Sequence, residues 1–404
     1  MNEQEKQFIL SHLNDDVRKL ALSKTPDGVN LRFVLEQIDG RQRAKTKLPS
    51  LAANPDIIFP VHLSVEQCSS EATAAYKASV MQHQLSAINY QLSIFADLTG
   101  GFGIDFIALS KLFKKAIYVE RNAELCAIAE QNFRTLNLTN TQIVNTEAED
   151  FLRLPSHNLP TLFFADPARR SESGSRTYAI SDCTPDILQL MPTLKAQGSL
   201  LFLKLSPMLD WHKAVEDIQA QGVNVSEVHI VSVKNECKEL LLLVELQVEP
   251  RPDFRLFCVN DESILEITAT VPSLSSEDER TFLLLPNASI MKAGCWDFLI
   301  SRFGVTQADP NSHIFFSDHE IADFPGKQYR IQAVCTMNKK ELRNALQGIT
   351  HANIAVRNFP LSADALRKRL KLKDGGDTYI FGTTIQGEHK LIVATPSNLP
   401  TKEE

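Results

Sequence analysis

The chain has 404 residues, of which 43% are apolar and 23% are charged. This composition is typical of a globular protein and excludes a disordered, collagen-like or coiled-coil chain. At about 100–200 residues per domain, the length predicts two to four domains. No apolar run reaches the roughly 20 residues of a membrane helix, and the N-terminus lacks the basic start of a signal peptide. We therefore expect a cytoplasmic protein without membrane association.

Cysteine spacing and charge distribution narrow the classes further. The 7 cysteines are widely spaced without a C-x-x-C pair, which argues against a metal site or a disulfide framework. The net charge of −7 is uneven, because residues 326–373 alone carry +9. A basic module on an acidic body is suited to docking a polyanion, although a solvated helix face would look the same.

The predicted elements begin with helices and continue with alternating strands and helices. Residues 1–75 predict a helical N-terminal domain, in which Ser64 and Gln67 fit a capping box. Residues 76–250 predict a Rossmann-like α/β domain with a parallel sheet. Its last two strands are joined by too few residues for a crossover helix and should pair antiparallel. We expect its seven strands at 93–98, 116–120, 142–145, 161–165, 199–205, 227–233 and 240–246.

The C-terminal part predicts smaller α+β domains. Residues 251–325 form a mixed segment, and Pro325-Gly326 marks a boundary. Residues 326–398 then predict the order strand, helix, strand, helix and two strands. The glycines at 375 and 376 supply the turn before the final pair of strands.

The clearest chemical motif is a glycine-rich turn where the first strand should end, Asp97-Leu98-Thr99-Gly100-Gly101-Phe102-Gly103. Glycines at this point permit a tight turn and close approach of a ligand to the backbone. A dinucleotide fingerprint requires a small third residue, where this chain has Phe106. An NAD-dependent enzyme is therefore disfavoured.

This turn resembles the first motif of class I S-adenosylmethionine-dependent methyltransferases, and the hairpin-ended sheet agrees with their fold. The resemblance implies that S-adenosylmethionine is the cofactor. It further implies that Glu120, at the end of the second strand, binds the ribose hydroxyls and that Glu147 lies near the adenine amine, with Glu149 and Asp150 as alternatives. Asp97 as a turn cap, Glu120 as a surface acid and Glu147 as a helix cap are the purely structural interpretations. The predicted cofactor-binding residues are Asp97, Thr99, Gly100, Gly101, Gly103, Glu120 and Glu147.

The end of the fourth strand, Asp166-Pro167-Ala168-Arg169, predicts the catalytic edge, because ligands of open α/β sheets bind at the carboxyl ends of strands. Asp166 is the catalytic candidate, able to orient a nucleophile or accept its proton, with Pro167 and Arg169 beside it. Alternatively, Asp166-Pro167 only shapes the loop. The aromatic residue that many nucleic-acid amine methyltransferases carry here is missing. Cys183 on the following loop is either a nucleophile or a packed thiol, and Lys204 is a further candidate for substrate contact.

Further stretches extend the resemblance over nearly the whole chain: Glu66–Glu71 with Tyr76-Lys77, Pro286–Ile290, Pro310–His313 and the basic C-terminal module. In this order they resemble a bacterial class I methyltransferase family with a helical N-terminal domain, a ferredoxin-like insert and a THUMP-like C-terminal domain. THUMP domains belong to RNA-modifying enzymes, so the resemblance implies RNA (tRNA or rRNA), and not DNA, as the partner. The candidate RNA-binding residues are Arg169, Arg170, Lys339, Lys340, Arg343, Arg367, Lys368, Arg369 and Lys371.

These observations predict an S-adenosylmethionine-dependent methyltransferase that acts on structured RNA. Two alternatives remain open. One is a methyltransferase of a protein or small molecule, for which the basic module would be incidental. The other is a non-catalytic RNA-binding or assembly factor built on a methyltransferase fold.

Overall fold

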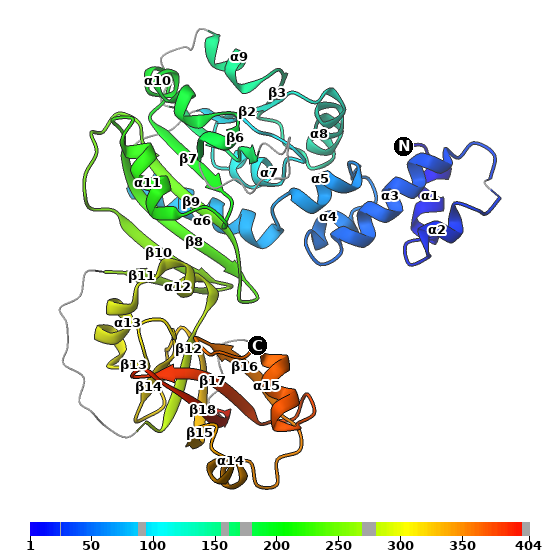
Figure 1. Cartoon of the computed structure of the whole chain (residues 1–404). Helices are drawn as coiled ribbons and strands as arrows, with labels where there is room; N and C mark the ends of the chain where they lie inside the picture. The colour runs from blue at the N-terminus through cyan, green and yellow to red at the C-terminus, as the bar shows by residue number, and fades with distance from the viewer. Residues whose placement is uncertain (25, 88–93, 155–160, 170–179, 269–279, 398–404) are drawn as a thin grey trace. The chain divides into compact units, whose positions relative to one another are not determined.

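A computed structural model describes the chain except for residues 25, 88–93, 155–160, 170–179, 269–279 and 398–404 (Figure 1). The chain divides into two compact units. Unit 1 comprises Met1–His229 and Lys238–Phe254, and unit 2 comprises Ile230–Cys237 and Arg255–Glu404.

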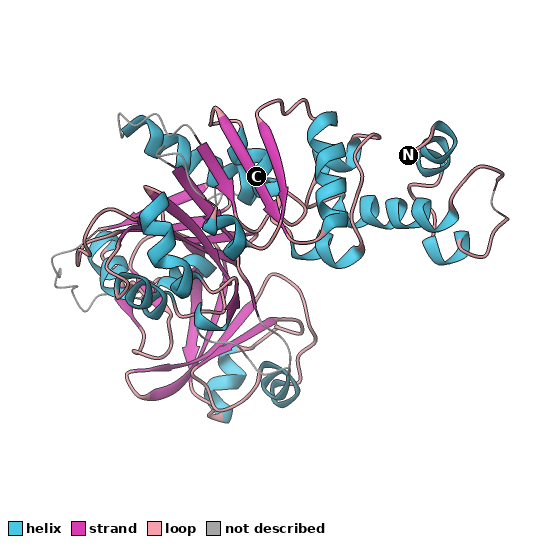
Figure 2. Cartoon of the chain, turned by 90° about the horizontal axis from the view of Figure 1, so that it is seen from above, coloured by secondary structure: helices cyan, strands magenta, loops and turns pink. Residues whose placement is uncertain are grey.

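Unit 1 begins with helices, and its described part up to the first strand contains only helix and loop (Figure 2). Asn2 and Glu5 form a capping box at the first helix, and Phe8 and Ile9 pack there with Val34 and Ile38. The capping box expected at Ser64 is wrong, because that helix starts two residues earlier and contains Ser64. The helices are α1 (Glu3–Ser11), α2 (Val17–Leu20), α3 (Leu31–Ala44), α4 (Pro49–Ala53), α5 (His62–Gln67) and α6 (Glu71–Ala87).

The central sheet follows, in the order β3-β2-β1-β4-β7-β9-β8. Strands β3 to β7 in that order pair in parallel, and β9 pairs antiparallel with β7. Strands β8 and β9 are neighbours and only two residues join them, so the antiparallel pairing expected for the last two strands is confirmed. The strands are β1 (Ile94–Asp97), β2 (Lys115–Glu120), β3 (Thr141–Asn145), β4 (Thr161–Ala165), β7 (Leu200–Leu205), β8 (Asn224–Val233) and β9 (Glu236–Glu245).

The connection between β8 and β9 is shorter than the sequence predicted. Only Lys234 and Asn235 separate the strands, and both have positive φ, at 51° and 58°. Two such residues define a type I′ turn, whose twist matches that of an antiparallel hairpin. The expected six-residue loop is wrong because β9 begins at Glu236, where polar residues continue the strand beyond its apolar part.

Helices cover the sheet on both sides, with α8 on one side and α10 and α11 on the other (Figure 1). Asn122, Asp186 and Asp210 cap α8, α10 and α11 through their side-chain oxygens, as residues at these positions commonly do. A short pair of strands, β5 (Ala168–Arg169) and β6 (Cys183–Thr184), lies apart from the main sheet. The other elements here are α7 (Ile104–Ser110), α8 (Ala123–Thr135), α9 (Ala148–Arg153), η1 (Ile180–Asp182), α10 (Ile187–Gln197) and α11 (Trp211–Gln219).

Unit 2 contains a second sheet in the order β13-β14-β12-β15-β18-β17-β16. Strands from both sides of Pro325-Gly326 join it, since β12 and β15 pair antiparallel with Pro286 opposite Gly326. The elements are β10 (Arg255–Asn260), β11 (Ser263–Ile267), β12 (Phe282–Pro286), α12 (Ala288–Ala293), α13 (Trp296–Phe303), β13 (Thr306–Gln307), β14 (Phe315–Ser317), β15 (Gly326–Cys335), α14 (Lys339–Ala345), β16 (Asn353–Arg357), α15 (Ala363–Leu370), β17 (Tyr379–Ile385) and β18 (Glu388–Pro396).

Side chains alternate between the two faces of this second sheet. Ile380 and Leu391 face a core that includes Leu342 of α14 and Leu366 of α15, so both helices pack on one face. Phe381 and Ile392 belong to the core of the other face. No helix in the described ranges is long and apolar enough to cross a membrane.

Candidate functional site

The glycine-rich turn lies at the carboxyl end of β1, between neighbouring strands. The Leu98 amide donates to the Phe164 carbonyl on one side, and the Gly100 amide donates to the Val119 carbonyl on the other. The buried Asp97 carboxylate accepts the Thr99 amide at 2.9 Å. Burial, with Asp105 and Asp166 nearby, raises the pKa of Asp97 to about 8. The Asp97 side chain therefore stabilises the turn, in agreement with its interpretation as a turn cap.

The three glycines of the turn have different surroundings, which a Cβ atom placed at each position makes clear. A Cβ atom at Gly100 would lie 2.3 Å from the Tyr118 ring, and one at Gly103 would lie 3.2 Å from the Phe133 ring. Gly101, at φ +57°, would place a Cβ no closer than 3.7 Å to its nearest neighbour, the Thr99 carbonyl oxygen. Gly100 and Gly103 thus permit internal packing, and Gly101 borders open space where a ligand can lie against the backbone.

Phe106 explains sterically why this turn differs from a dinucleotide fingerprint. Its side chain is fully buried and stacks on Phe133 of α8 with ring centroids 4.8 Å apart. Close packing of helix against strand at this position normally depends on a small residue. Here the aromatic ring fills the space between α7 and α8.

Glu120, at the end of β2, contacts the turn directly. Its Oε2 accepts the Gly101 amide at 2.9 Å, and its Oε1 accepts the Asn122 amide at 2.8 Å. A carboxylate offers about four acceptor sites, so each oxygen retains capacity for one more donor. Two adjacent hydroxyl groups of a ligand fit that requirement. Glu120 and Gly101 are therefore brought together as the sequence analysis expected.

Glu147 lies further out. It occupies the N-cap position of α9 without a side-chain capping bond, and it is exposed. Its nearest charged partner is the Arg121 guanidinium, with 3.8 Å between Glu147 Oε1 and Arg121 Nη1. An exposed pair of this kind contributes little to stability, which leaves the carboxylate available to a ligand.

Asp166 follows β4 and reaches the same turn. Its amide donates to Thr99 Oγ1 at 2.7 Å, and its Oδ2 forms an ion pair with Lys204 Nζ at the end of β7. The Asp166 side chain is 37% exposed, whereas that of Lys204 is 11% exposed. Burial opposes the ammonium form, but Asp166, Asp105 and Glu239 outweigh it and raise the pKa of Lys204 above its usual value. Pro167, next to Asp166, is buried.

The loop candidates are only partly described. Arg169 lies on β5 opposite Cys183, and Arg170 lies outside the described residues. Cys183 is 1% exposed. A nucleophilic thiol needs an accessible, electropositive surrounding, so this burial favours the packed interpretation.

An ionic cluster that was not predicted from the sequence lies beside the candidate site. Lys77 of α6 is fully buried and contacts Glu239 of β9 and Asp105 of α7. Ser69 donates to Asp105 at 2.7 Å. The available signal was the helical stripe of Thr73, Ala74, Lys77, Val80 and Met81, where a lysine occupies an apolar position.

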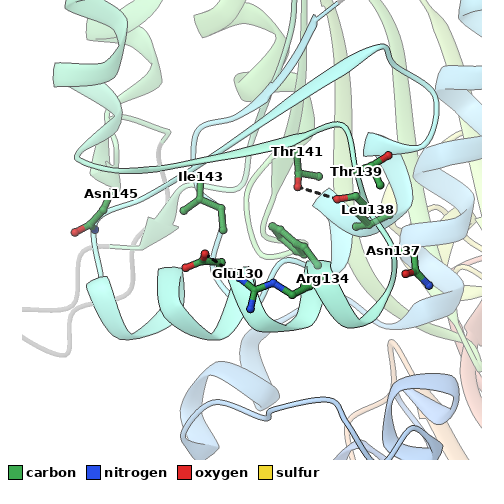
Figure 3. A pocket seen from close by; sticks show the side chains of 9 residues that line it. Glu130, Arg134, Asn137, Leu138, Thr139, Thr141, Ile143 and Asn145 are labelled. Atoms are coloured by element: carbon green, nitrogen blue, oxygen red, sulfur yellow. Dashed lines mark hydrogen bonds and ion pairs between the residues drawn. The ribbon is translucent and has the colours of Figure 1, made fainter.

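A hollow of about 630 Å³ lies between α8 and β3, away from the glycine turn (Figure 3). It is lined by Glu130 and Arg134 of α8 and extends to Asn137 and Thr139, before the amino end of β3. Ligands of open α/β sheets bind at the carboxyl ends of the strands. The hollow is therefore distinct from the candidate site.

Six of the predicted RNA-binding cations form an exposed group in unit 2, named here the basic cluster: Lys339, Lys340 and Arg343 of α14 with Lys368, Arg369 and Lys371 of α15 and its C-cap. Both helices lie on one face of the sheet. Arg367 differs, because it forms ion pairs with Asp364 and Asp374 and is 24% exposed.

The strand order and the turn define the class of protein. A parallel sheet β3-β2-β1-β4-β7 closed by the antiparallel β9 and β8 is the class I methyltransferase fold. Residues 282–325 match a family described as a ferredoxin-like domain, and residues 326–396 match one described as THUMP domain-like. The chain is a class I S-adenosylmethionine-dependent methyltransferase with a THUMP-like C-terminal domain.

Known relatives match this chain over most of their length. Two Mycobacterium tuberculosis proteins, described as uncharacterized S-adenosylmethionine-dependent methyltransferases, are each 22% identical over 348 residues, covering 82% of this chain and 87% of theirs. The crystal structure of a Porphyromonas gingivalis W83 protein assigned as a methyltransferase has 28% identity and a TM-score of 0.81. That match covers 98% of this chain and 100% of the other.

Proposed function

We propose that the chain methylates structured RNA, either tRNA or rRNA, at the carboxyl edge of its central sheet. The observation that carries the catalytic part is that Glu120 accepts the Gly101 amide while the Asp166 amide donates to Thr99 of the same turn. A Cβ atom at Gly101 would have only the Thr99 carbonyl oxygen within 4 Å, which leaves room there for a ligand. The basic cluster supports the RNA part. The catalytic part and the RNA-binding part depend on different residues, so separate substitutions test each of them.

The residues at the turn fit S-adenosylmethionine. Gly101 admits a ligand against the backbone, and Glu120 has acceptor capacity for a pair of ribose hydroxyls. Glu147, exposed at the start of α9, is available to an adenine amine. Asp97 acts indirectly by shaping the turn. The cofactor supplies a methyl group activated by its sulfonium charge.

Asp166 is the proposed catalytic residue. Its Oδ2 is held by Lys204, so Oδ1 is the oxygen left to face a substrate donor. Methyl transfer is an in-line displacement, for which orientation of the nucleophile contributes much of the rate acceleration. Asp166 in this role orients the attacking group and accepts a hydrogen bond from it.

RNA is favoured as the substrate by the position of the cations. Phosphate neutralisation by lysine and arginine supplies most non-specific affinity for nucleic acids. The basic cluster offers six exposed cations on two helices that pack on one face of the sheet in the THUMP-like domain. Base-edge recognition would have to come from elsewhere, which agrees with recognition of RNA by its shape.

The test combines cofactor binding with methyl incorporation. We expect calorimetric titration with S-adenosylhomocysteine to show saturable binding that Gly101→Ala weakens by more than about tenfold, or 1.4 kcal/mol. Gly304→Ala is the matched control, since Gly304 has φ +64° and nothing within 4 Å of its Cβ position. The control should bind normally.

Transferred label then identifies the substrate class. Methyl label from S-adenosylmethionine should enter RNA and disappear on ribonuclease treatment. Label in protein or small molecules would contradict the RNA assignment. Binding of both cofactor and RNA without transfer would instead indicate a non-catalytic factor.

A further inference from the structure

A fully buried lysine connects the helices before the sheet to the catalytic edge. Lys77 Nζ lies 2.6 and 2.8 Å from the two carboxylate oxygens of Glu239 and 3.2 Å from Asp105 Oδ1. It also lies 3.3 Å from Ser69 Oγ. The side chain of Lys77 is 0% exposed, so its charge is stabilised only by these protein groups.

The contacts continue from this lysine to the catalytic acid. Asp105 Oδ2 lies 3.9 Å from Lys204 Nζ, and Lys204 in turn holds Asp166. The charges therefore alternate from Lys77 on α6 through Asp105 on α7 to Lys204 on β7. Of these groups only Asp166, at the end of the series, is substantially exposed.

The balance of charge decides where Lys204 points. Three carboxylates, Asp105, Glu239 and Asp166, share the two ammonium groups of Lys77 and Lys204. An uncompensated charge in a buried site is costly, because neighbouring water cannot stabilise it. Without Lys77, Asp105 and Glu239 would have only Lys204 to neutralise them. Lys204 would then be drawn inward and away from Asp166.

We propose that Lys77 is a positioning residue for methyl transfer, which neutralises Asp105 and Glu239 so that Lys204 remains on Asp166. This inference rests on the role proposed above for Asp166. Lys77 of α6 would thereby influence the orientation of the Asp166 carboxylate indirectly, through Asp105 and Lys204.

The first test is kinetic. Lys77→Met should lower kcat about 100-fold, the loss typical of a misplaced catalytic group, while S-adenosylhomocysteine affinity stays within about twofold. The double variant Lys77→Met/Glu239→Gln removes one cation and one carboxylate together, and should regain about tenfold in kcat. A purely structural role for Lys77 would give no such recovery. Unchanged kcat in Lys77→Met would overturn the proposal.

Arg41→Met is the matched control for loss of a buried cation. Arg41 lies in α3 and its Nη2 donates to the main-chain carbonyls of Pro55 and Ile57, with no contact to the cluster. We expect this variant to lose stability but to keep kcat. Equal kcat losses in Arg41→Met and Lys77→Met would assign the effect to general destabilisation.

The acceptor and a second measurement separate this proposal from the RNA assignment. Kinetics use unfractionated cell extract as methyl acceptor, so ribonuclease-resistant label would refute RNA while leaving the Lys77 comparison intact. A double-mutant cycle of Lys77→Met and Lys204→Met in urea denaturation requires no substrate. Non-additive loss of stability supports the connection, and strict additivity would refute it whatever the substrate.

Discussion

At the residue scale, the most unusual group in the site is the Asp97 carboxyl. It is 1% exposed, lies in a turn and has Asp105 and Asp166 as acidic neighbours. The amide of Thr99 stabilises its ionised form only partly. Asp97 consequently favours its protonated form at a pH where exposed aspartates are ionised.

This shift predicts a pH-dependent stability. Folding raises the pKa of Asp97 from 3.8 to about 8, so the folded state binds a proton that the unfolded state releases. The contribution of this group to stability is therefore present below pH 3.8 and lost as pH rises towards 8. Asp97→Asn keeps an acceptor for the Thr99 amide and does not titrate.

Urea denaturation of Asp97→Asn and the wild type at pH 5 and pH 8 measures the effect. We expect the variant to gain stability relative to the wild type as the pH rises. The exposed Asp15→Asn should follow the wild type at both values. Parallel curves for Asp97→Asn would show that the carboxyl is ionised throughout.

Residues of the candidate site differ in how far the sequence could identify them. Gly101 and Glu120 belong to short motifs beside strand ends, and local pattern was enough to bring them together. The requirement for Gly100 depends on Tyr118 of the next strand. Lys77 depends on Glu239, which is 162 residues away. The helical stripe of α6 indicated that Lys77 is buried, but contacts of such separation have no local signal, so its partners could not be predicted.

At the scale of elements, one side chain joins the N-terminal helices to the sheet domain within unit 1. Asn132 of α8 is 2% exposed, and its side-chain amide forms two hydrogen bonds with the main chain of Ile58. Asn132 Oδ1 accepts the Ile58 amide, and Asn132 Nδ2 donates to the Ile58 carbonyl oxygen, at 2.8 Å each. These two hydrogen bonds fix the segment around Ile58, which precedes α5, to α8. The hydrogen bonds satisfy two main-chain groups that packing would otherwise leave unpaired.

Asn132→Ala should therefore destabilise unit 1 by about 2 kcal/mol, because Ile58 loses both partners. We expect the region around residue 58 to become susceptible to limited proteolysis before the rest of the chain. Gln131→Ala, an exposed change on the same helix, should leave the digestion pattern unaltered. Identical protection in the two variants would mean that apolar packing alone holds this segment.

How accurately the bounds of a strand were predicted depended on how apolar its residues are. The apolar run of β4 was predicted at its observed bounds, 161–165, since it is bracketed by prolines and an aspartate. The start of β9 was missed because Glu236 and Lys238 resemble a loop, although they continue the hairpin in the structure. Periodicity locates buried strands well and exposed strand ends poorly.

At the scale of the whole molecule, charge is separated along the chain. Residues 326–373 carry a net charge of +9, although the full chain carries −7. The basic cluster concentrates six of those cations on α14 and α15. Because the rest of the chain is acidic and repels nucleic acid, most of the non-specific affinity for RNA should come from this region.

Replacing Lys368, Arg369 and Lys371 by Gln should weaken RNA binding uniformly across sequences and reduce its salt-dependence slope by about 2–3. Filter binding at several salt concentrations measures this slope. The control replaces Arg18, Lys19 and Lys24, three exposed cations of unit 1, and removes the same charge. Equal slopes in the two variants would place the RNA contacts elsewhere.

The close packing of Gly100 against Tyr118 restricts which residues can replace either of them during evolution. The Tyr118 ring occupies the space that a side chain at position 100 would need, and the Tyr118 hydroxyl donates a hydrogen bond to the Gly101 carbonyl. Neither position can change freely while the other is kept. In homologous chains the two should covary, with a larger residue at 100 appearing only beside a smaller one at 118.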